Sequence, residues 1–173
     1  MHSQVQEIHL VDPSSLVIET LNKELKDSYI TIPDKLIVHK MKGQDLKVQG
    51  EKKCIFIAGM GGKEIIEILE NLIPQLQGPD QIILSPHRKV YELRGYLSQS
   101  PLLLDEEVLV FENEQYYQVL ALSFHGKQKV HPFGEAIWQG PLGKAYKMHT
   151  LKNFRPHKDL ISTNLVAYLE AIL

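Results

Sequence analysis

The stretch that decides the fold is CIFIAGMGGKEIIEIL, residues 54–69. Its first five residues, 54–58, form a short apolar run of the kind that is buried on both faces of a parallel sheet. The glycine-rich turn 59–62 follows, and then come apolar residues at helical spacing, namely Ile65, Ile66, Ile68 and Leu69. A strand, a glycine turn and a helix in this order build a ligand crevice in open α/β sheets. Taken alone, GMGG is better explained as a tight strand-to-helix connection. The rest of the chain favours a ligand-binding turn instead.

Length and composition predict one globular domain with a substantial core, because the chain has 173 residues, 43% hydrophobic and 23% charged. The net charge of −2 gives no global attraction to nucleic acid or membrane surfaces. The single cysteine, Cys54, excludes an internal disulfide, and its apolar strand predicts a small buried side chain rather than a nucleophile. The sequence shows no membrane-span-like apolar run and no signal-peptide layout, so we expect a cytoplasmic protein.

Strands and helices alternate over the first hundred residues. We predict strands at 5–11, 35–39, 53–58 and 81–84, and helices at 14–25, 63–73 and 89–97. This order calls for a mostly parallel sheet. Two long strands at 102–111 and 115–124 then form a β-hairpin, because only three residues separate them. The segment 125–158 is irregular and carries seven Lys or Arg against one acid, Glu135, and an amphipathic helix at 160–173 ends the chain.

Three segments resemble the bacterial family that methylates N1 of adenine 22 in tRNA with S-adenosylmethionine. They are IFIAGMGG at 55–62, IILSPHRKVYELRGYL at 82–97, and EEVLVFENEQYYQVLAL at 106–122. The resemblance covers residues 5–145. It implies an α/β fold with a Rossmann-like methyltransferase sheet that is mostly parallel, a terminal antiparallel β-hairpin and a C-terminal helix. It also implies an S-adenosylmethionine-dependent tRNA adenine-N1 methyltransferase-like protein, with tRNA as its partner.

The chain departs from the family pattern in three places. The family's first strand and glycine-rich cofactor loop, which precede the strand at 5–11, have no counterpart. The family's Gln-Pro-Asn after the fourth strand is Ser85-Pro86-His87, and its helical hairpin is reduced to one terminal helix. We therefore expect a methyltransferase-type domain at 1–125 that is incomplete at its N-terminus, and a basic segment with a helix at 126–173. The alternative is a non-catalytic methyltransferase-fold module that binds RNA or protein.

The resemblance implies where the cofactor would bind. Asp12 ends the first strand, where a carboxylate accepts hydrogen bonds from ribose hydroxyls, although Asp-Pro-Ser is equally a helix start. Gln44 and Asp45 follow the second strand, where they would meet the adenine amino group, or they form a solvated turn on Gly43. The methyl acceptor would lie over the turn formed by Gly59, Met60, Gly61 and Gly62.

A smaller set of residues could serve catalysis and RNA binding. His87 is the candidate catalytic base, because imidazole titrates near neutrality, although an exposed loop histidine is commoner. Tyrosines could stack a flipped base, or they are ordinary packing residues: Tyr91, Tyr96, Tyr116 and Tyr117. Basic residues could meet RNA phosphates, or they are solvated faces: Arg88, Arg94, Lys144, Lys147, Lys152 and Arg155. No ligand spacing suggests a metal, and nothing indicates the oligomeric state.

Overall fold

The computed structural model describes residues 7–27 and 36–172. Contacts divide the chain into two compact units. The first unit comprises Met1–Val48 and Ile68–Gln75, and the second comprises Gln49–Glu67 and Leu76–Leu173. This division follows packing and does not coincide with the expected boundary between residues 125 and 126, which stays a prediction about domain organisation. Each unit is described by itself.

The first unit contains a two-stranded parallel sheet and one long helix. Strand β1 (Ile8–Val11) pairs with β2 (Leu36–His39), and Ile8 lies opposite Leu36. Helix α1 (Ser15–Asp27) connects these strands, and the short 3-10 helix η1 (Gly43–Asp45) follows β2. The strand, helix and strand predicted here are confirmed, while residues 5 and 6 of the predicted first strand and residue 35 of the predicted second strand lie outside the described residues.

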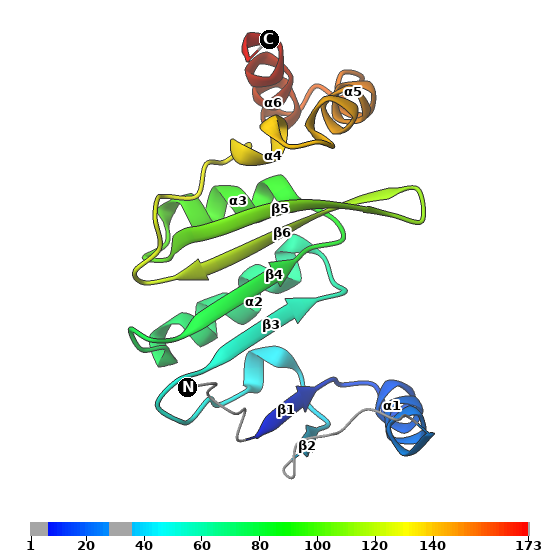
Figure 1. Cartoon of the computed structure of the whole chain (residues 1–173), viewed down its shortest axis with the longest axis vertical. Coiled ribbons are helices and arrows are strands. Elements are labelled where there is room, and N and C mark those ends of the chain that lie inside the picture. Colours follow the sequence, from blue (N-terminus) through cyan, green and yellow to red (C-terminus); the bar gives the residue numbers. More distant parts are fainter. Residues whose placement is uncertain (1–6, 28–35, 173) are drawn as a thin grey trace. The chain divides into compact units, whose positions relative to one another are not determined.

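The second unit contains a four-stranded mixed sheet, in the order β3-β4-β6-β5 (Figure 1). Strand β3 (Cys54–Ala58) is parallel to β4 (Gln81–Ser85). The predicted hairpin is confirmed as β5 (Leu103–Glu112) and β6 (Gln115–Ser123), and β6 is antiparallel to both β4 and β5. A tight turn joins the two hairpin strands, because Asn113 and Glu114 adopt positive φ angles of 48° and 62°.

One face of this sheet carries the hydrophobic core. Helix α3 (Val90–Gln99) and residues 62–67 of helix α2 (Gly62–Leu72) lie on that same face (Figure 1), while residues 68–72 belong to the first unit. The 3-10 helix η2 (Ile73–Gln75) continues α2 in the first unit. Alternate strand residues point to this face, which follows from the two-residue period of a strand. The buried strand residues include Ile57, Ile82, Leu84, Leu120 and Leu122, and the buried helix residues include Ile65, Leu93 and Leu97.

The other face of the sheet is open at β3. The side chain of Phe56 is 70% exposed, and Cys54 and Ala58 are exposed as well. The prediction that 54–58 is buried on both faces is therefore wrong, and so is the prediction of a buried Cys54. The reason is position: among the described residues β3 pairs with β4 alone, so it is an edge strand.

Residues 125–135 are irregular as expected, but the rest of the basic segment is mostly helical, which corrects the expectation of an irregular stretch over the whole of 125–158. It contains α4 (Ala136–Gln139) and α5 (Gly143–Phe154), and α6 (Leu160–Ala171) confirms the predicted terminal helix. The buried side of α5 consists of Gly143, Tyr146 and Thr150. Because two of these residues are small or polar, the sequence lacks the apolar stripe that would have indicated the helix.

Candidate ligand site at the glycine turn

The glycine turn is joined to the loop after β4 by backbone hydrogen bonds. The N–H of Gly62 donates to the carbonyl of Arg88 at 2.7 Å, and the N–H of His87 donates to the carbonyl of Met60 at 2.9 Å. Both loops leave the carboxyl ends of parallel neighbours, β3 and β4. The sequence therefore builds one continuous backbone surface where open α/β sheets bind ligands.

The glycines of this turn differ in how a side chain at each position would be tolerated. A Cβ on Gly62 would collide with the backbone carbonyl oxygen of Lys89 and lie 3.1 Å from Cβ of Leu93. Gly59 has a φ of +78°, which favours glycine, and nothing lies within 4 Å of the place where its Cβ would be. A Cβ on Gly61 would meet only the end of the flexible Glu64 side chain. Gly62 thus serves the tight connection, whereas Gly59 leaves exposed backbone facing open space.

His87 and a tyrosine of the hairpin lie beside this turn. The exposed ring of His87 has its centroid 5.3 Å from that of Tyr117, with the planes tilted by 59°. The hydroxyl of Tyr117 donates to Gln115 at 3.1 Å. The structure therefore brings together a titratable imidazole, an aromatic ring and open glycine backbone. Such a group can hold a planar ligand and exchange a proton with it.

The other predicted cofactor residues belong to the first unit. Asp12 Oδ1 accepts a hydrogen bond from the backbone N–H of Ser14 at 2.7 Å, and Ser14 Oγ accepts one from Val17 N at 3.4 Å, at the start of α1. The helix-start interpretation of Asp12 is thus observed, while its ribose role stays a prediction. Gln44 and Asp45 lie in η1, half-buried and exposed respectively. Whether they share a site with the glycine turn also stays a prediction.

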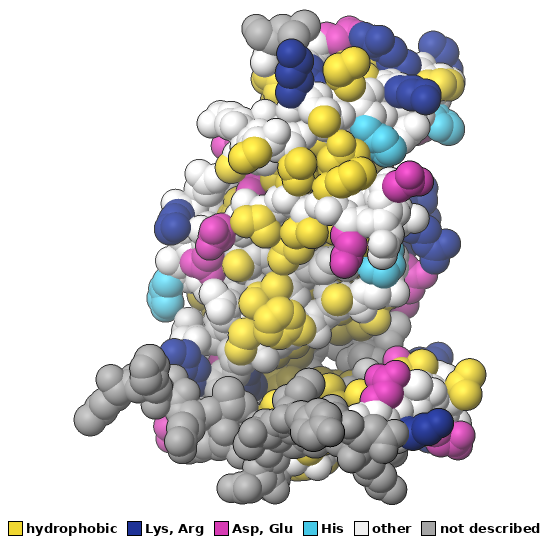
Figure 2. All heavy atoms as spheres, turned by 45° about the vertical axis from the view of Figure 1, so that its right-hand side comes forward, with side chains coloured by type: hydrophobic (Ala, Val, Ile, Leu, Met, Phe, Trp, Pro, Cys, Tyr) yellow, Lys and Arg dark blue, Asp and Glu magenta, His cyan; other side chains and the backbone are white. Residues whose placement is uncertain are grey.

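Most of the predicted RNA-binding residues are accessible. Arg88 is exposed in the loop after β4, and the others lie on or just after α5: Lys144, Lys147, Lys152 and Arg155. Lys147 is half-buried, and Arg155 Nη2 lies 2.8 Å from Glu170 Oε1. Figure 2 shows Lys and Arg side chains gathered over these C-terminal helices. Their role toward RNA stays a prediction.

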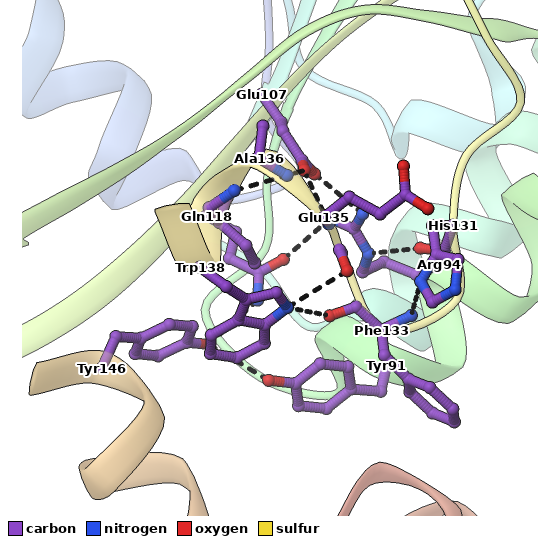
Figure 3. Close-up of polar contacts among 12 residues, drawn as sticks. Tyr91, Arg94, Glu107, Gln118, His131, Phe133, Glu135, Ala136, Trp138 and Tyr146 are labelled. Atoms are coloured by element: carbon purple, nitrogen blue, oxygen red, sulfur yellow. Dashed lines mark hydrogen bonds and ion pairs between the residues drawn. The ribbon is translucent and has the colours of Figure 1, made fainter. Parts of the chain in front are cut away.

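Arg94 is the exception, and its prediction as a phosphate ligand requires correction. Its side chain is fully buried, so no surface remains for a phosphate. Its guanidinium instead donates three hydrogen bonds: Nε to the carbonyl of His131 at 2.8 Å, Nη1 to Gln118 Oε1 at 3.0 Å, and Nη2 to Glu107 Oε2 at 2.8 Å (Figure 3).

Glu107 connects this buried arginine to the C-terminal helices. Its Oε1 accepts hydrogen bonds from the backbone N–H groups of Glu135 at 3.1 Å and Ala136 at 2.9 Å, where α4 begins (Figure 3). Burial alone would raise the pKa of Glu107, but the Arg94 charge and the hydrogen bonds outweigh it and hold this pKa below its usual value of 4.5. Glu107 is therefore an ionised helix cap inside the protein.

Sequence reasoning missed this buried network, which also includes Gln118 and Tyr146, joined by a 2.9 Å hydrogen bond. One signal was available. The side chains of β5 alternate between the two faces, and Glu107 falls on the inward side of that pattern. A carboxylate at an inward position requires a buried cation, and Arg94 lies among the buried leucines of α3.

The described residues contain neither a cluster of potential metal ligands nor a helix suited to span a membrane. In residues 7–27 and 36–172, no group of three or more His, Cys, Asp or Glu side chains is placed to hold a metal ion. No helix within these ranges has the length and apolar character to cross a membrane.

Comparison with known sequences assigns a family to part of the chain. A family model described as "Methyltransferase domain" matches residues 1–120. The tRNA (adenine(22)-N(1))-methyltransferase of Bacillus subtilis (strain 168) is 37% identical over 81 residues, which are 46% of this chain and 34% of that protein. The matched part thus spans about a third of the length of this curated relative.

Comparison with solved structures shows the same fold. A candidate tRNA (m1A22) methyltransferase of Streptococcus pneumoniae has a TM-score of 0.75 at 19% identity, covering 98% of this chain and 83% of that one. TrmK of M. capricolum, solved with S-adenosyl-homocysteine, has a TM-score of 0.72 at 15% identity, covering 96% and 80%. At such identities the likeness concerns the fold, which is Rossmann-like.

Proposed function

Because the chain belongs to the methyltransferase-domain family, we propose that it transfers a methyl group from S-adenosylmethionine to N1 of an adenine in tRNA. One observation carries the proposal: the open glycine turn lies beside His87 and Tyr117 in a chain whose curated relative is named for this reaction. A tRNA substrate also implies that the protein acts in the cytoplasm.

The chain supplies groups whose chemistry suits an adenosine-containing cofactor. The exposed backbone at Gly59 faces open space, which a side chain would fill. We assign the ribose hydroxyls to the Asp12 carboxylate, because a carboxylate accepts several hydrogen bonds at once. The adenine amino group is assigned to Gln44 and Asp45, and the methyl end to the turn Gly59, Met60, Gly61 and Gly62. When bound, the cofactor supplies an electrophilic methyl group on a sulfonium sulfur.

The chain's own residues then position the acceptor base and move a proton. The bound cofactor would supply the methyl group and be released as a neutral thioether, and the methylated adenine would carry the positive charge. The role proposed for His87 is to accept a proton from the exocyclic amino group of the methylated base. Stacking on the Tyr117 ring holds the extruded adenine in place.

The basic residues on and after α5, together with Arg88, form the proposed RNA-docking surface. With about four phosphate contacts, the slope of log K against log salt is near −3 to −4. The quadruple change Lys144→Ala, Lys147→Ala, Lys152→Ala and Arg155→Ala is expected to flatten this slope without unfolding the protein, since no side chain of the four is fully buried. Filter binding with unmodified tRNA over a salt series measures it, and equal retention by the variant contradicts this docking surface.

Methyl transfer is tested with labelled S-adenosylmethionine and unmodified tRNA. We expect His87→Ala to lower the single-turnover rate by about 10²-fold or more, while the matched change His125→Ala, at another exposed histidine of the second unit, leaves it unchanged. Calorimetry with S-adenosyl-homocysteine is expected to show Asp12→Ala weakening binding by about 1–3 kcal/mol. Retention of tRNA with neither cofactor binding nor methyl transfer would identify a non-catalytic RNA-binding module instead.

A further inference from the structure

The tip of the hairpin extends past the end of β4. The pairing of β4 with β6 ends where Leu84 lies opposite Leu120, so residues 115–119 of β6 run beyond β4. The glycine turn and His87 lie at this same end of the sheet, because they follow the carboxyl ends of β3 and β4. The tip therefore adjoins the candidate ligand site, and the ring of Tyr117 packs against His87 there.

The opposite face of the tip carries a second group of rings, Phe111, Tyr116 and His149, which we call the aromatic platform. Phe111 and Tyr116 lie opposite each other in the register of β5 and β6, and their ring centroids are 4.6 Å apart. The ring of Tyr116 also lies 5.2 Å from that of His149 on α5. Because successive strand residues point to opposite faces, Tyr116 faces α5 while Tyr117 faces the candidate ligand site.

Buried side chains hold the platform from behind. The ring of Tyr116 lies 5.0 Å from that of the buried Tyr146, which stacks on Trp138 at 5.0 Å with the planes only 10° apart (Figure 3). The Tyr146 hydroxyl accepts a hydrogen bond from the buried Gln118 at 2.9 Å, and Trp138 Nε1 donates one to the carbonyl of Phe133 at 3.0 Å. Supports of this kind fix a binding surface in place before its ligand arrives.

The two outer rings of the platform are accessible. The side chain of Phe111 is 49% exposed, and His149 is exposed as well. The amide nitrogen of Asn153 lies 2.8 Å from His149 Nε2, and this hydrogen bond fixes the orientation of the imidazole ring. Contact between the hairpin and α5 is already provided by Tyr116 and Tyr146, so the outer rings have surface left for a planar ligand.

The charge beside the platform indicates which planar ligand fits. Helix α5 contains three lysines and no acidic residue. Lys152 follows His149 by three residues, so the two side chains are neighbours on the helix surface. Of the acids at the tip, Glu112 points to the other face of the hairpin and Glu114 lies in the turn beyond Phe111. Aromatic rings beside lysines suit an unpaired nucleotide, because its base stacks and its phosphate is anionic.

We propose that the aromatic platform is a second base-binding subsite, which stacks an unpaired nucleotide next to the adenine that is methylated. This inference rests on the proposed function, because the tip has the platform on one face and the pair of Tyr117 and His87 on the other. A single RNA strand that crosses the tip presents one base to each face, and Lys152 binds a phosphate near the platform. The substrate adenine must therefore have an unpaired neighbour, as it does in a loop or at the end of a stem.

Fluorescence anisotropy with a labelled single-stranded oligoadenylate of about ten nucleotides tests the subsite in the absence of cofactor. Phe111→Ala is expected to weaken binding by about 10-fold, the effect of losing one base–aromatic stack. Phe111→Tyr keeps a ring at this position and should bind as the parent does. His149→Ala should also weaken binding, whereas His149→Phe should not, because stacking requires the ring and not its titration.

Val108→Ala is the matched control and should leave binding unchanged. Val108 is an apolar residue of the same strand and is 43% exposed, but it points to the other face of the hairpin. Salt dependence separates stacking from charge. Lys152→Ala should reduce the slope of log K against log salt by about 0.7, the value of one single-strand phosphate contact. Phe111→Ala should instead lower log K equally at every salt concentration.

Several results would overturn the subsite. These are equal affinity of the parent and Phe111→Ala, equal loss of affinity in Val108→Ala, and parent affinity for a duplex of the same length that matches its affinity for the single strand. Failure of the proposed function has a different signature. A parent that binds oligoadenylate through Phe111 but transfers no methyl group to tRNA would contradict the methyltransferase proposal and leave the subsite standing. Methyl transfer by the parent, with unchanged affinity and rate in Phe111→Ala, would overturn the subsite alone.

Discussion

The two edge strands of the four-stranded sheet depart in opposite ways from the rule that charged side chains are exposed and apolar side chains are buried. On β5, the charged Glu107 points inward and pairs with the fully buried Arg94. On β3, at the other edge, the apolar Phe56 points outward and is 70% exposed. A charge is buried where the C-terminal helices supply partners for it, and an aromatic ring is exposed where no element of the described part of the chain covers it. Residue type therefore predicts burial only together with the element that packs against it.

The largest effect is expected at the buried charge. Glu107→Ala leaves Arg94 without its carboxylate and the start of α4 without its cap, so we expect a loss of about 3–5 kcal/mol in the free energy of unfolding. Urea denaturation measures it. The matched change Arg155→Ala breaks an ion pair whose side chains are 58% and 51% exposed, and it should cost at most about 1 kcal/mol. Similar losses in the two variants would show that the buried ion pair contributes no more to stability than the exposed one.

An intermediate effect is expected within β3, between two neighbouring residues. Ile57 is 6% exposed on the covered face, so Ile57→Ala should cost about 2–4 kcal/mol. Phe56 is larger but exposed, and Phe56→Ala should change the free energy of unfolding by no more than about 1 kcal/mol. Urea denaturation of the two variants makes this comparison. A greater loss at Phe56 than at Ile57 would mean that another element covers the open face.

The smallest effect concerns pH. The pKa of Glu107 is lowered in the folded state, so its contribution to stability is fully present above the unfolded value of 4.5 and is lost as the pH falls through the folded value. We expect the urea midpoint to fall on acidification below about pH 5. The decline should be shallower in Glu107→Gln, which cannot titrate there. Parallel declines would assign the acid sensitivity to another carboxylate, of which the buried Asp80 also has a lowered pKa.

The sequence predicted the elements with strong periodic patterns and missed what depends on partners. The strands, the hairpin and the terminal helix follow from apolar spacing and turn length, and the structure confirms them. Helix α5 was missed because its buried side includes Gly143 and Thr150. At the candidate site, the glycine turn was predicted, whereas the close packing that requires Gly62 depends on Lys89, a residue distant in sequence. Arg94 was misplaced because the signal for its burial lies elsewhere in the sequence, in the inward position of Glu107 on β5.

The capping of α4 by Glu107 has a consequence for the order of folding. The cap joins a hairpin strand to backbone groups almost thirty residues further along the chain. During synthesis, α3 and the hairpin emerge first, and Glu107 has no amide donors to bind until residues 135–137 arrive. Closing this long loop is entropically costly, so we expect the C-terminal helices to dock after the rate-limiting step. Their docking would then lengthen the lifetime of the native state while leaving the speed at which it forms almost unchanged.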